Sequence, residues 1–230
     1  MANRASQLPP QMIAAGMSVD FVAVSWGAAL GDSYYDAMLM DMSVFEAGLK
    51  AQEEGYDAVC IDTVSDSGMY ALRSKLDIPV LGPGQAAFHV ACMLGHKFSI
   101  ITMWDEWFHL YTKVLSQYKL ESRCASMRSI DTRPDLAELL AGKEEVIFEK
   151  LEAEARKAIE QDNADVIVLG STTMHQSHAY LQAVLPVPVI NPGLISYKLC
   201  EMFLETGLTH SRKAFAAPQQ PNDKMILSRN

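Results

Sequence analysis

The feature of this sequence that most limits its fold is a segment that occurs twice. Residues Asp57–Gly84 and Asp165–Gly193 follow one plan: an acidic residue, a short apolar run, a hydroxyl-rich turn, a helical stretch, a second apolar run and a Pro-Gly pair. The copies align at an offset of roughly 108 residues, with one residue inserted before the second run. Short apolar runs bounded by turn residues, such as Val166–Leu169, indicate buried strands of a parallel sheet. The chain is therefore predicted to contain two copies of one βαβ unit.

Strands and helices alternate along the rest of the chain. Apolar runs at Val19–Trp26 and Phe98–Thr102 indicate further strands, and periodic apolar residues indicate helices at Asp36–Gln52 and Glu144–Gln161. This alternation, with the duplication, predicts an α/β fold of two pseudo-symmetric lobes. Each lobe is expected to be a parallel sheet flanked by helices, with the active-site cleft between the two lobes.

The length and composition fit this prediction. A chain of 230 residues, 49% hydrophobic and 20% charged, suffices for two lobes of a soluble protein. We expect the first lobe to comprise residues 1–103 and 206–230, and the second to comprise residues 104–205. The net charge of −9 gives no support to a nucleic-acid partner, and no run approaches the ~18 apolar residues of a membrane span. Four cysteines without close spacing indicate reduced thiols and a cytoplasmic protein.

A hydroxyl-rich turn follows the first strand of each copy. Thr63-Val64-Ser65 in one copy corresponds to Ser171-Thr172-Thr173 in the other. Ligands of parallel sheets bind at the carboxyl ends of strands, where N–H groups at a helix start can hold carboxylate or ureido oxygens. Ser and Thr also cap helices without any ligand. Because both copies share the position, we predict that these turns contact a small-molecule substrate, with Thr63 and Ser171 among the catalytic residues.

Two histidines follow the second turn. His175 lies four residues after Ser171 and His178 three residues further, so on one helix they would be neighbours. We predict that His175 is a general acid or base beside Ser171 and that His178 contacts the substrate. A hydrogen-bonded structural role is the alternative for His175. A metal-binding pair is a third reading, but it lacks the usual supporting motif, and we predict no metal and no cofactor.

Two acidic residues and one tryptophan complete the predicted site. Asp62 precedes the first turn at a strand end, where burying an acid is costly unless it is paired or used, and we expect it to be catalytic. Asp66 is expected either to contact the substrate or to cap a helix. Trp104 belongs to an aromatic cluster that is expected to cover the cleft, although such clusters also form cores.

Several further motifs are typical of one known family. They are Tyr34-Tyr35-Asp36, Gly55-Tyr56-Asp57-Ala58-Val59, Asp66-Ser67-Gly68-Met69, Leu94-Gly95-His96-Lys97-Phe98-Ser99, Arg128-Ser129-Ile130-Asp131 and Gly207-Leu208-Thr209-His210-Ser211. With these motifs the chain resembles the aspartate/glutamate/hydantoin racemase superfamily, and most closely its hydantoin and allantoin racemase branch. The resemblance covers most of the chain and implies two α/β lobes with the active site between them.

The resemblance also implies a catalytic cysteine in each repeat's turn. In that family one thiolate removes the proton α to a carbonyl, and the other thiol delivers a proton from the opposite face. The matching positions here are Thr63 and Ser171, and Cys60 lies three residues before the first of them. A thiol with a pKa of about 8.5 is a usable base, whereas an unactivated hydroxyl is far too weak. Racemisation by two thiols is therefore not expected.

Three functions stay open. The main prediction is an enzyme of this superfamily that hydrolyses or eliminates a small carboxylate- or ureido/imide-bearing metabolite. The alternatives are a racemase of hydantoin-type or amino-acid substrates with non-cysteine bases, and a non-catalytic small-ligand-binding protein. The resemblance implies a homo-oligomer. It also implies an initial strand and an asparagine-containing turn, so either that strand is missing here or Asn3–Ser6 stands in for the turn.

Overall fold

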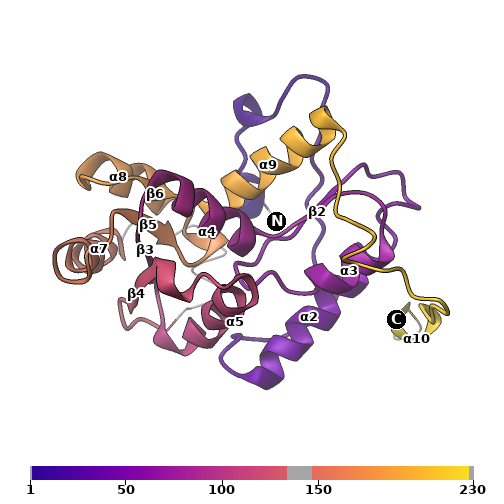
Figure 1. Cartoon of the computed structure of the whole chain (residues 1–230), viewed down its shortest axis with the longest axis horizontal. Coiled ribbons are helices and arrows are strands. Elements are labelled where there is room, and N and C mark those ends of the chain that lie inside the picture. Colours follow the sequence, from indigo (N-terminus) through magenta and orange to yellow (C-terminus); the bar gives the residue numbers. More distant parts are fainter. Residues whose placement is uncertain (1, 134–146, 228–230) are drawn as a thin grey trace.

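The computed structural model describes residues 2–133 and 147–227 of the chain (Figure 1). Its helices are α1 (Ala2–Ala5), α2 (Tyr34–Gly48), α3 (Met69–Lys75), α4 (Pro83–Leu94), α5 (Phe108–Tyr118), α7 (Phe148–Asp162), α8 (Ser177–Val184), α9 (Pro192–Thr206) and α10 (Lys224–Leu227). Its strands are β1 (Val59–Cys60), β2 (Val80–Leu81), β3 (Phe98–Thr102), β4 (Cys124–Ser129), β5 (Val166–Leu169) and β6 (Val189–Ile190). Short 3-10 helices lie at Pro10–Met12, Asp105–Trp107, Glu121–Arg123 and Thr172–Met174.

The strands form two parallel sheets, and the duplication is visible in both. One sheet has the order β1-β2, and the other has the order β4-β3-β5-β6. The same hydrogen bond joins the paired strands of each copy: Val59 N donates to Pro79 O, and Ile167 N donates to Pro188 O, both at 2.9 Å. The predicted α/β fold with helix-flanked parallel sheets is confirmed.

The four-stranded sheet is buried on both faces. On β5, Val166 and Val168 pack with α4 and α5, whereas Ile167 and Leu169 pack with α7 and α8. All four side chains have no exposed surface, because successive residues of a strand point to opposite faces and helices cover both faces. In Figure 1, α7 and α8 lie at one end of the molecule beside this sheet, and α2 and α3 lie toward the other end.

The two-stranded sheet has a smaller core. Its buried residues are Ile61, Met69, Leu72, Leu76 and Val80. Helix α9 packs against β1, β2 and α4 and so connects the two halves of the molecule. The carboxyl ends of β1 and β5 consequently face a common region.

Three expectations from the sequence need correction or restriction. Val19–Trp26 does not form a strand in the described structure; Val22 is 65% exposed, and an extended segment without a partner strand cannot form a ladder. β3, which the expected boundary at residue 103 assigns to the first lobe, pairs with β4 and β5 of the second range, and the division into lobes stays a prediction. The helix expected from Glu144 begins outside the described residues, and the structure describes it as α7 from Phe148.

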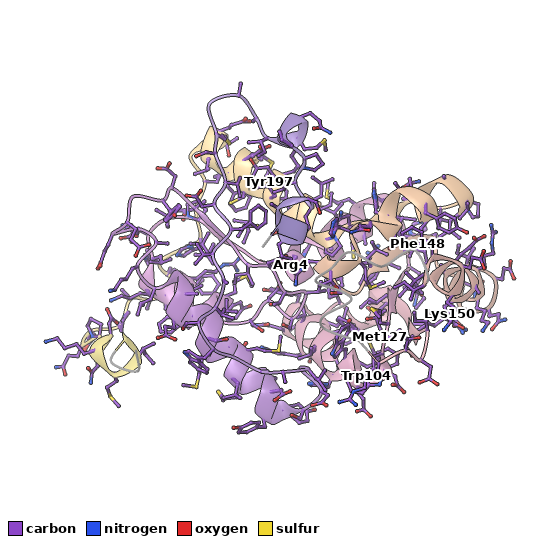
Figure 2. The ribbon with its side chains drawn as sticks, turned by 180° about the vertical axis from the view of Figure 1, so that it is seen from behind. Arg4, Trp104, Met127, Phe148, Lys150 and Tyr197 are labelled. Atoms are coloured by element: carbon purple, nitrogen blue, oxygen red, sulfur yellow. The ribbon has the colours of Figure 1, made fainter. Side chains whose placement is uncertain are left out.

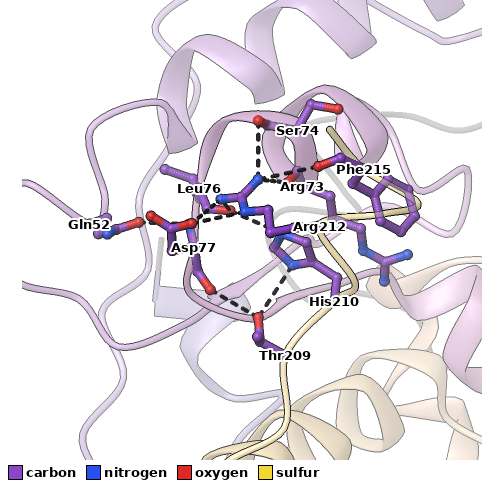
Figure 3. Close-up of polar contacts among 9 residues, drawn as sticks. All are labelled: Gln52, Arg73, Ser74, Leu76, Asp77, Thr209, His210, Arg212 and Phe215. Atoms are coloured by element: carbon purple, nitrogen blue, oxygen red, sulfur yellow. Dashed lines mark hydrogen bonds and ion pairs between the residues drawn. The ribbon is translucent and has the colours of Figure 1, made fainter. Parts of the chain in front are cut away.

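The segment after α9 folds back onto the end of α3 (Figure 3). Arg212 donates hydrogen bonds to the carbonyl oxygens of Arg73, Ser74 and Leu76, which close the last turn of that helix. His210 Nε2 lies 2.9 Å from the Leu76 carbonyl oxygen. Cationic and imidazole groups at a helix C-terminus satisfy carbonyls that have no partner within the helix. This segment therefore holds the helix that follows the first hydroxyl-rich turn.

Candidate active site

The two duplicated turns line one pocket. Residues 62–65 after β1 and residues 170–172 after β5 enclose a cavity of about 110 Å³. Thr172 Oγ1 donates a hydrogen bond of 3.1 Å to the backbone oxygen of Asp62, so the turns are joined directly. Thr63 and Ser171 both line this pocket, as the duplication predicts. β1 and β5 belong to different sheets, and the packing of α9 between the two halves turns their carboxyl ends toward one region, so turns 108 positions apart in the sequence meet here.

Arg4 and Asp62 supply the charges of the pocket. Arg4 Nη1 lies 3.5 Å from Asp62 Oδ2 and donates a hydrogen bond of 3.1 Å to Thr172 Oγ1. Gln7 Nε2 also donates to Asp62 Oδ2, at 3.3 Å. The Arg4 and Asp62 side chains are 23% and 37% exposed, so both are accessible from the pocket. Figure 2 places Arg4 near the middle of the molecule. The pocket thus offers a fixed cation and a carboxylate side by side.

The Gly170–Ser171 turn rests on a buried tyrosine. Tyr111 Oη donates to the Gly170 carbonyl oxygen at 2.8 Å and shares a hydrogen bond of 2.8 Å with Thr102 Oγ1. A Cβ on Gly170 would lie 2.7 Å from Tyr111 Oη and 2.8 Å from Thr102 Cβ, so glycine is needed for this close approach. Burial raises the pKa of Tyr111, and the phenol stays neutral.

The two turn hydroxyls also cap their own turns. Ser171 Oγ accepts a hydrogen bond from Thr173 N at 3.2 Å and is 2.7 Å from Thr173 Oγ1. Thr63 Oγ1 accepts a longer bond of 3.4 Å from Ser67 N. Val64, Ser65 and Thr172 line the pocket, and the Thr173 hydroxyl contacts that of Ser171; the predicted contact of these residues with a substrate stays a prediction. Capping and contact with a ligand are therefore compatible at these positions.

The histidines lie elsewhere. His175 Nε2 is 3.0 Å from Ser6 Oγ, and among the hydrogen bonds of the described residues none joins His175 to Ser171. Burial lowers the pKa of His175, which keeps the ring neutral near pH 7. His178 Nε2 is 3.0 Å from the Val189 carbonyl oxygen, beneath β6. The residues that line the pocket include neither ring, so the general acid or base role of His175 and the substrate contact of His178 stay untested predictions.

Asp66 and Trp104 also lie outside the pocket lining. Asp66 is buried and caps α4: its two carboxylate oxygens accept hydrogen bonds of 2.7 Å from Gly84 N and Gln85 N. Burial raises its pKa to about 7. Trp104 packs at the edge of the core, and Trp107 of the same aromatic cluster lines the pocket instead. In Figure 2, Trp104 lies toward the lower edge of the molecule, away from Arg4.

The four cysteines are free, and none of them is among the residues that line the pocket. Cys60 is exposed as a residue, but its Sγ lies 3.0 Å from Oγ of the buried Ser196, and burial raises the pKa of this thiol. Cys92 and Cys124 are half-buried and Cys200 is buried. Within residues 2–133 and 147–227, His, Cys, Asp and Glu side chains do not cluster in threes that could hold a metal ion. No helix of the described chain is long and apolar enough to cross a membrane.

Reasoning from the sequence did not single out several residues of the pocket. Arg4 falls in Asn3–Ser6, which in one of the two readings given above stands in for the asparagine-containing turn, but its side chain was not predicted to face Asp62. Tyr111, Leu110 and Met40 come from α5 and α2, where they follow ordinary helical periodicity. Their sequence pattern alone therefore does not distinguish them from core residues.

Comparisons with known proteins agree on one family. A family model described as Asp/Glu/Hydantoin racemase matches residues 2–200. A hydantoin racemase from Pseudomonas sp. (strain NS671) is 31% identical over 210 residues, which is 90% of this chain and 83% of that protein. The structure of allantoin racemase from Klebsiella pneumoniae superposes with a TM-score of 0.86 at 26% identity, covering 96% of this chain and 89% of that one. The structure of allantoin racemase from Pseudomonas fluorescens superposes with a TM-score of 0.87 at 25% identity, covering 96% of this chain and 92% of that one.

Proposed function

Because the chain belongs to the Asp/Glu/hydantoin racemase family, we propose that it racemises a hydantoin-type substrate with Asp62 as the base. The observation that carries this proposal is the Asp62 carboxylate beside Arg4, in a pocket lined by both duplicated turns. The names of the relatives favour racemisation over the hydrolysis or lyase step expected from the sequence.

Racemisation requires a base that can reach the substrate. The hydrogen at C5 of a hydantoin is α to a carbonyl, and it must leave one face of the carbon and return to the other. Among the described residues that line the pocket, Arg4, Asp62 and Tyr111 are the ionisable ones. Arginine stays protonated, and burial keeps Tyr111 neutral, so the carboxylate of Asp62 is the available proton acceptor.

Arg4 has a complementary task. When Asp62 takes the proton, the electron pair of the carbon–hydrogen bond moves into the carbonyl group and its oxygen becomes negative. The guanidinium of Arg4, 3.5 Å from Asp62, is placed to stabilise that oxygen. One such preorganised donor is worth about 3–4 kcal/mol of transition-state stabilisation. The protonated Asp62 then returns the proton once the planar enolate presents its other face.

The hydroxyls of Thr63 and Ser171 serve binding in this scheme. Each is held by a hydrogen bond from its own turn and still borders the pocket. They can accept hydrogen bonds from ring N–H groups or donate to ring carbonyls without changing charge. This division of tasks leaves proton transfer to Asp62 and orientation of the ring to the two hydroxyls.

The test is Asp62→Asn assayed on an enantiopure 5-substituted hydantoin by loss of optical rotation. The amide keeps the size of the side chain but removes the base, so kcat should fall about 10²–10⁴-fold with little change in KM. In deuterated water the parent should introduce deuterium at C5. Glu53→Gln, which changes an exposed acid away from the pocket, is the matched control and should keep full activity. Full activity of Asp62→Asn would refute the assignment of the base.

A further inference from the structure

A second cavity lies among α2, α3 and α5. Its volume is about 340 Å³, and it shares no lining residue with the candidate active site in the described part of the chain. Small-molecule sites typically have volumes of roughly 300–1,000 Å³, apolar walls and a few polar groups that orient the ligand. Figure 1 shows the three helices next to one another. This cavity therefore has room for a ligand of its own.

The walls of this cavity are mainly apolar. Helices α2 and α3 supply the apolar side chains, which are Met42, Phe45, Met69, Tyr70 and Ala71. The ring of Tyr70 makes edge contacts with the rings of Tyr118 and Phe215, at centroid distances of 6.5 and 5.1 Å. These contacts hold one wall in place, whereas methionine side chains adapt to the shape of what they contact. The interior therefore favours an aromatic or aliphatic group.

An ion pair between two helices borders the same cavity. Lys113 Nζ of α5 lies 3.1 Å from Oδ1 and 3.0 Å from Oδ2 of Asp41 on α2, and Gly68 N donates to Oδ1 at 3.0 Å. The Lys113 and Asp41 side chains are 40% and 34% exposed, so a ligand that enters from solvent can reach both. The cavity thus combines an apolar interior with a cation and a carboxylate side by side.

Both members of this ion pair can form further hydrogen bonds. An ammonium group has three donors, and Lys113 uses at most two of them, both on Asp41. A carboxylate accepts about four hydrogen bonds, and Asp41 accepts three within residues 2–133 and 147–227. The pair therefore offers a donor and an acceptor to a ligand, next to each other.

The charges of the lining favour a ligand that carries both signs. A ligand with a single charge would place that charge beside a like charge, because Asp41 and Lys113 lie within 3.1 Å of each other. The other acid of the lining, Asp66, is buried, and its two oxygens are bound by Gly84 N and Gln85 N. A zwitterion, in contrast, meets an opposite charge at each of its charged groups.

From these observations we infer that the cavity among α2, α3 and α5 binds a free α-amino acid with an apolar side chain. The carboxylate of the amino acid accepts a hydrogen bond from Lys113, and its ammonium group donates one to Asp41. Its side chain enters the apolar interior beside Phe45 and Tyr70. This inference does not rest on the proposed racemase activity.

The test is an NMR titration of the ¹⁵N-labelled full-length protein with phenylalanine, each enantiomer separately. The backbone amide signals of Gly68 and Lys113 should shift saturably with at least one enantiomer. N-acetylphenylalanine lacks the ammonium group, phenethylamine lacks the carboxylate and glycine lacks the side chain, so each should bind at least roughly tenfold more weakly. The inference would be overturned by the absence of a saturable shift with either enantiomer, or by equal affinity for any of the three analogues.

Two variants locate the bound amino acid. Lys113→Met keeps the aliphatic stem but removes the ammonium group, and Ala71→Phe fills the cavity from an exposed position of α3; each should weaken binding by roughly tenfold or more. Lys150→Met, which changes an exposed lysine of α7, is the matched control and should leave binding unchanged.

Arg4→Ala distinguishes this cavity from the candidate active site, because it removes the cation of the other pocket. Binding of phenylalanine to Arg4→Ala should equal binding to the parent. Loss of binding in Arg4→Ala, or unchanged binding in Lys113→Met, would place the amino acid elsewhere and overturn the inference. The result with Lys113→Met decides the matter even if Ala71→Phe does not fold.

Discussion

Asp66 should make the stability of this protein depend on pH in an unusual direction. Its carboxyl group is buried beneath the start of α4, where its two oxygens accept hydrogen bonds from Gly84 N and Gln85 N. Burial outweighs these two donors and raises the pKa from its ordinary value of 3.8 to about 7. The folded protein therefore favours the protonated acid, whereas the unfolded chain ionises at much lower pH.

The magnitude follows from linkage between protonation and folding. A pKa raised on folding gives stability that is fully present below the unfolded pKa and is lost as the pH rises through the folded one. The folded and unfolded pKa values differ by about three pH units, and each unit is worth about 1.36 kcal/mol. The ionisation of Asp66 therefore lowers the free energy of unfolding by about 4 kcal/mol in total. Most of that loss falls between pH 5 and pH 8. Asparagine does not titrate, so Asp66→Asn should remove this part of the pH dependence.

The assay is urea unfolding of parent and variant, followed by tryptophan fluorescence at pH 5 and pH 8. At pH 5 the parent should be the more stable protein, because the amide replaces one acceptor by a donor that faces an N–H group. At pH 8 the advantage should shrink or reverse. Asp77→Asn is the control. Because Arg212 lowers the pKa of Asp77, this variant and the parent should differ in free energy of unfolding by the same amount at both pH values. If the parent and Asp66→Asn differed in free energy of unfolding by the same amount at pH 5 and pH 8, the raised pKa of Asp66 would be refuted.

Three further variants test the site and its support. Tyr111→Phe should lower the free energy of unfolding by about 1–3 kcal/mol and reduce turnover, since the Gly170 carbonyl loses its buried donor; denaturation and optical-rotation assays measure both. Replacing Thr63 and Ser171 together by cysteine should add racemase activity that iodoacetamide destroys. The parent's own activity should resist the reagent, because its cysteines do not line the pocket. Arg212→Ala should release the segment after α9 from the end of α3, so limited proteolysis of that segment should become faster. Catalytic turnover should stay unchanged, because Arg212 does not line the pocket.

The sequence by itself determined the elements whose signal is local. The apolar runs at Phe98–Thr102 and Val166–Leu169 became strands with the predicted bounds, because runs of this length can be buried on both faces of a parallel sheet. The duplication fixed which turns meet, since equivalent strands end at equivalent places, and it brought Thr63 and Ser171 to one pocket.

The tertiary structure decided where side chains point and what covers each edge. Val19–Trp26 had the composition of a strand but found no neighbouring strand to pair with. Asp66 was expected to contact the substrate or to cap a helix, and the helix that it caps begins 17 residues later, at Pro83. His175 faces Ser6, and Arg4 faces Asp62, because the first helix lies across the ends of both sheets. Such contacts join residues far apart in the sequence, and no local pattern encodes the distance between them.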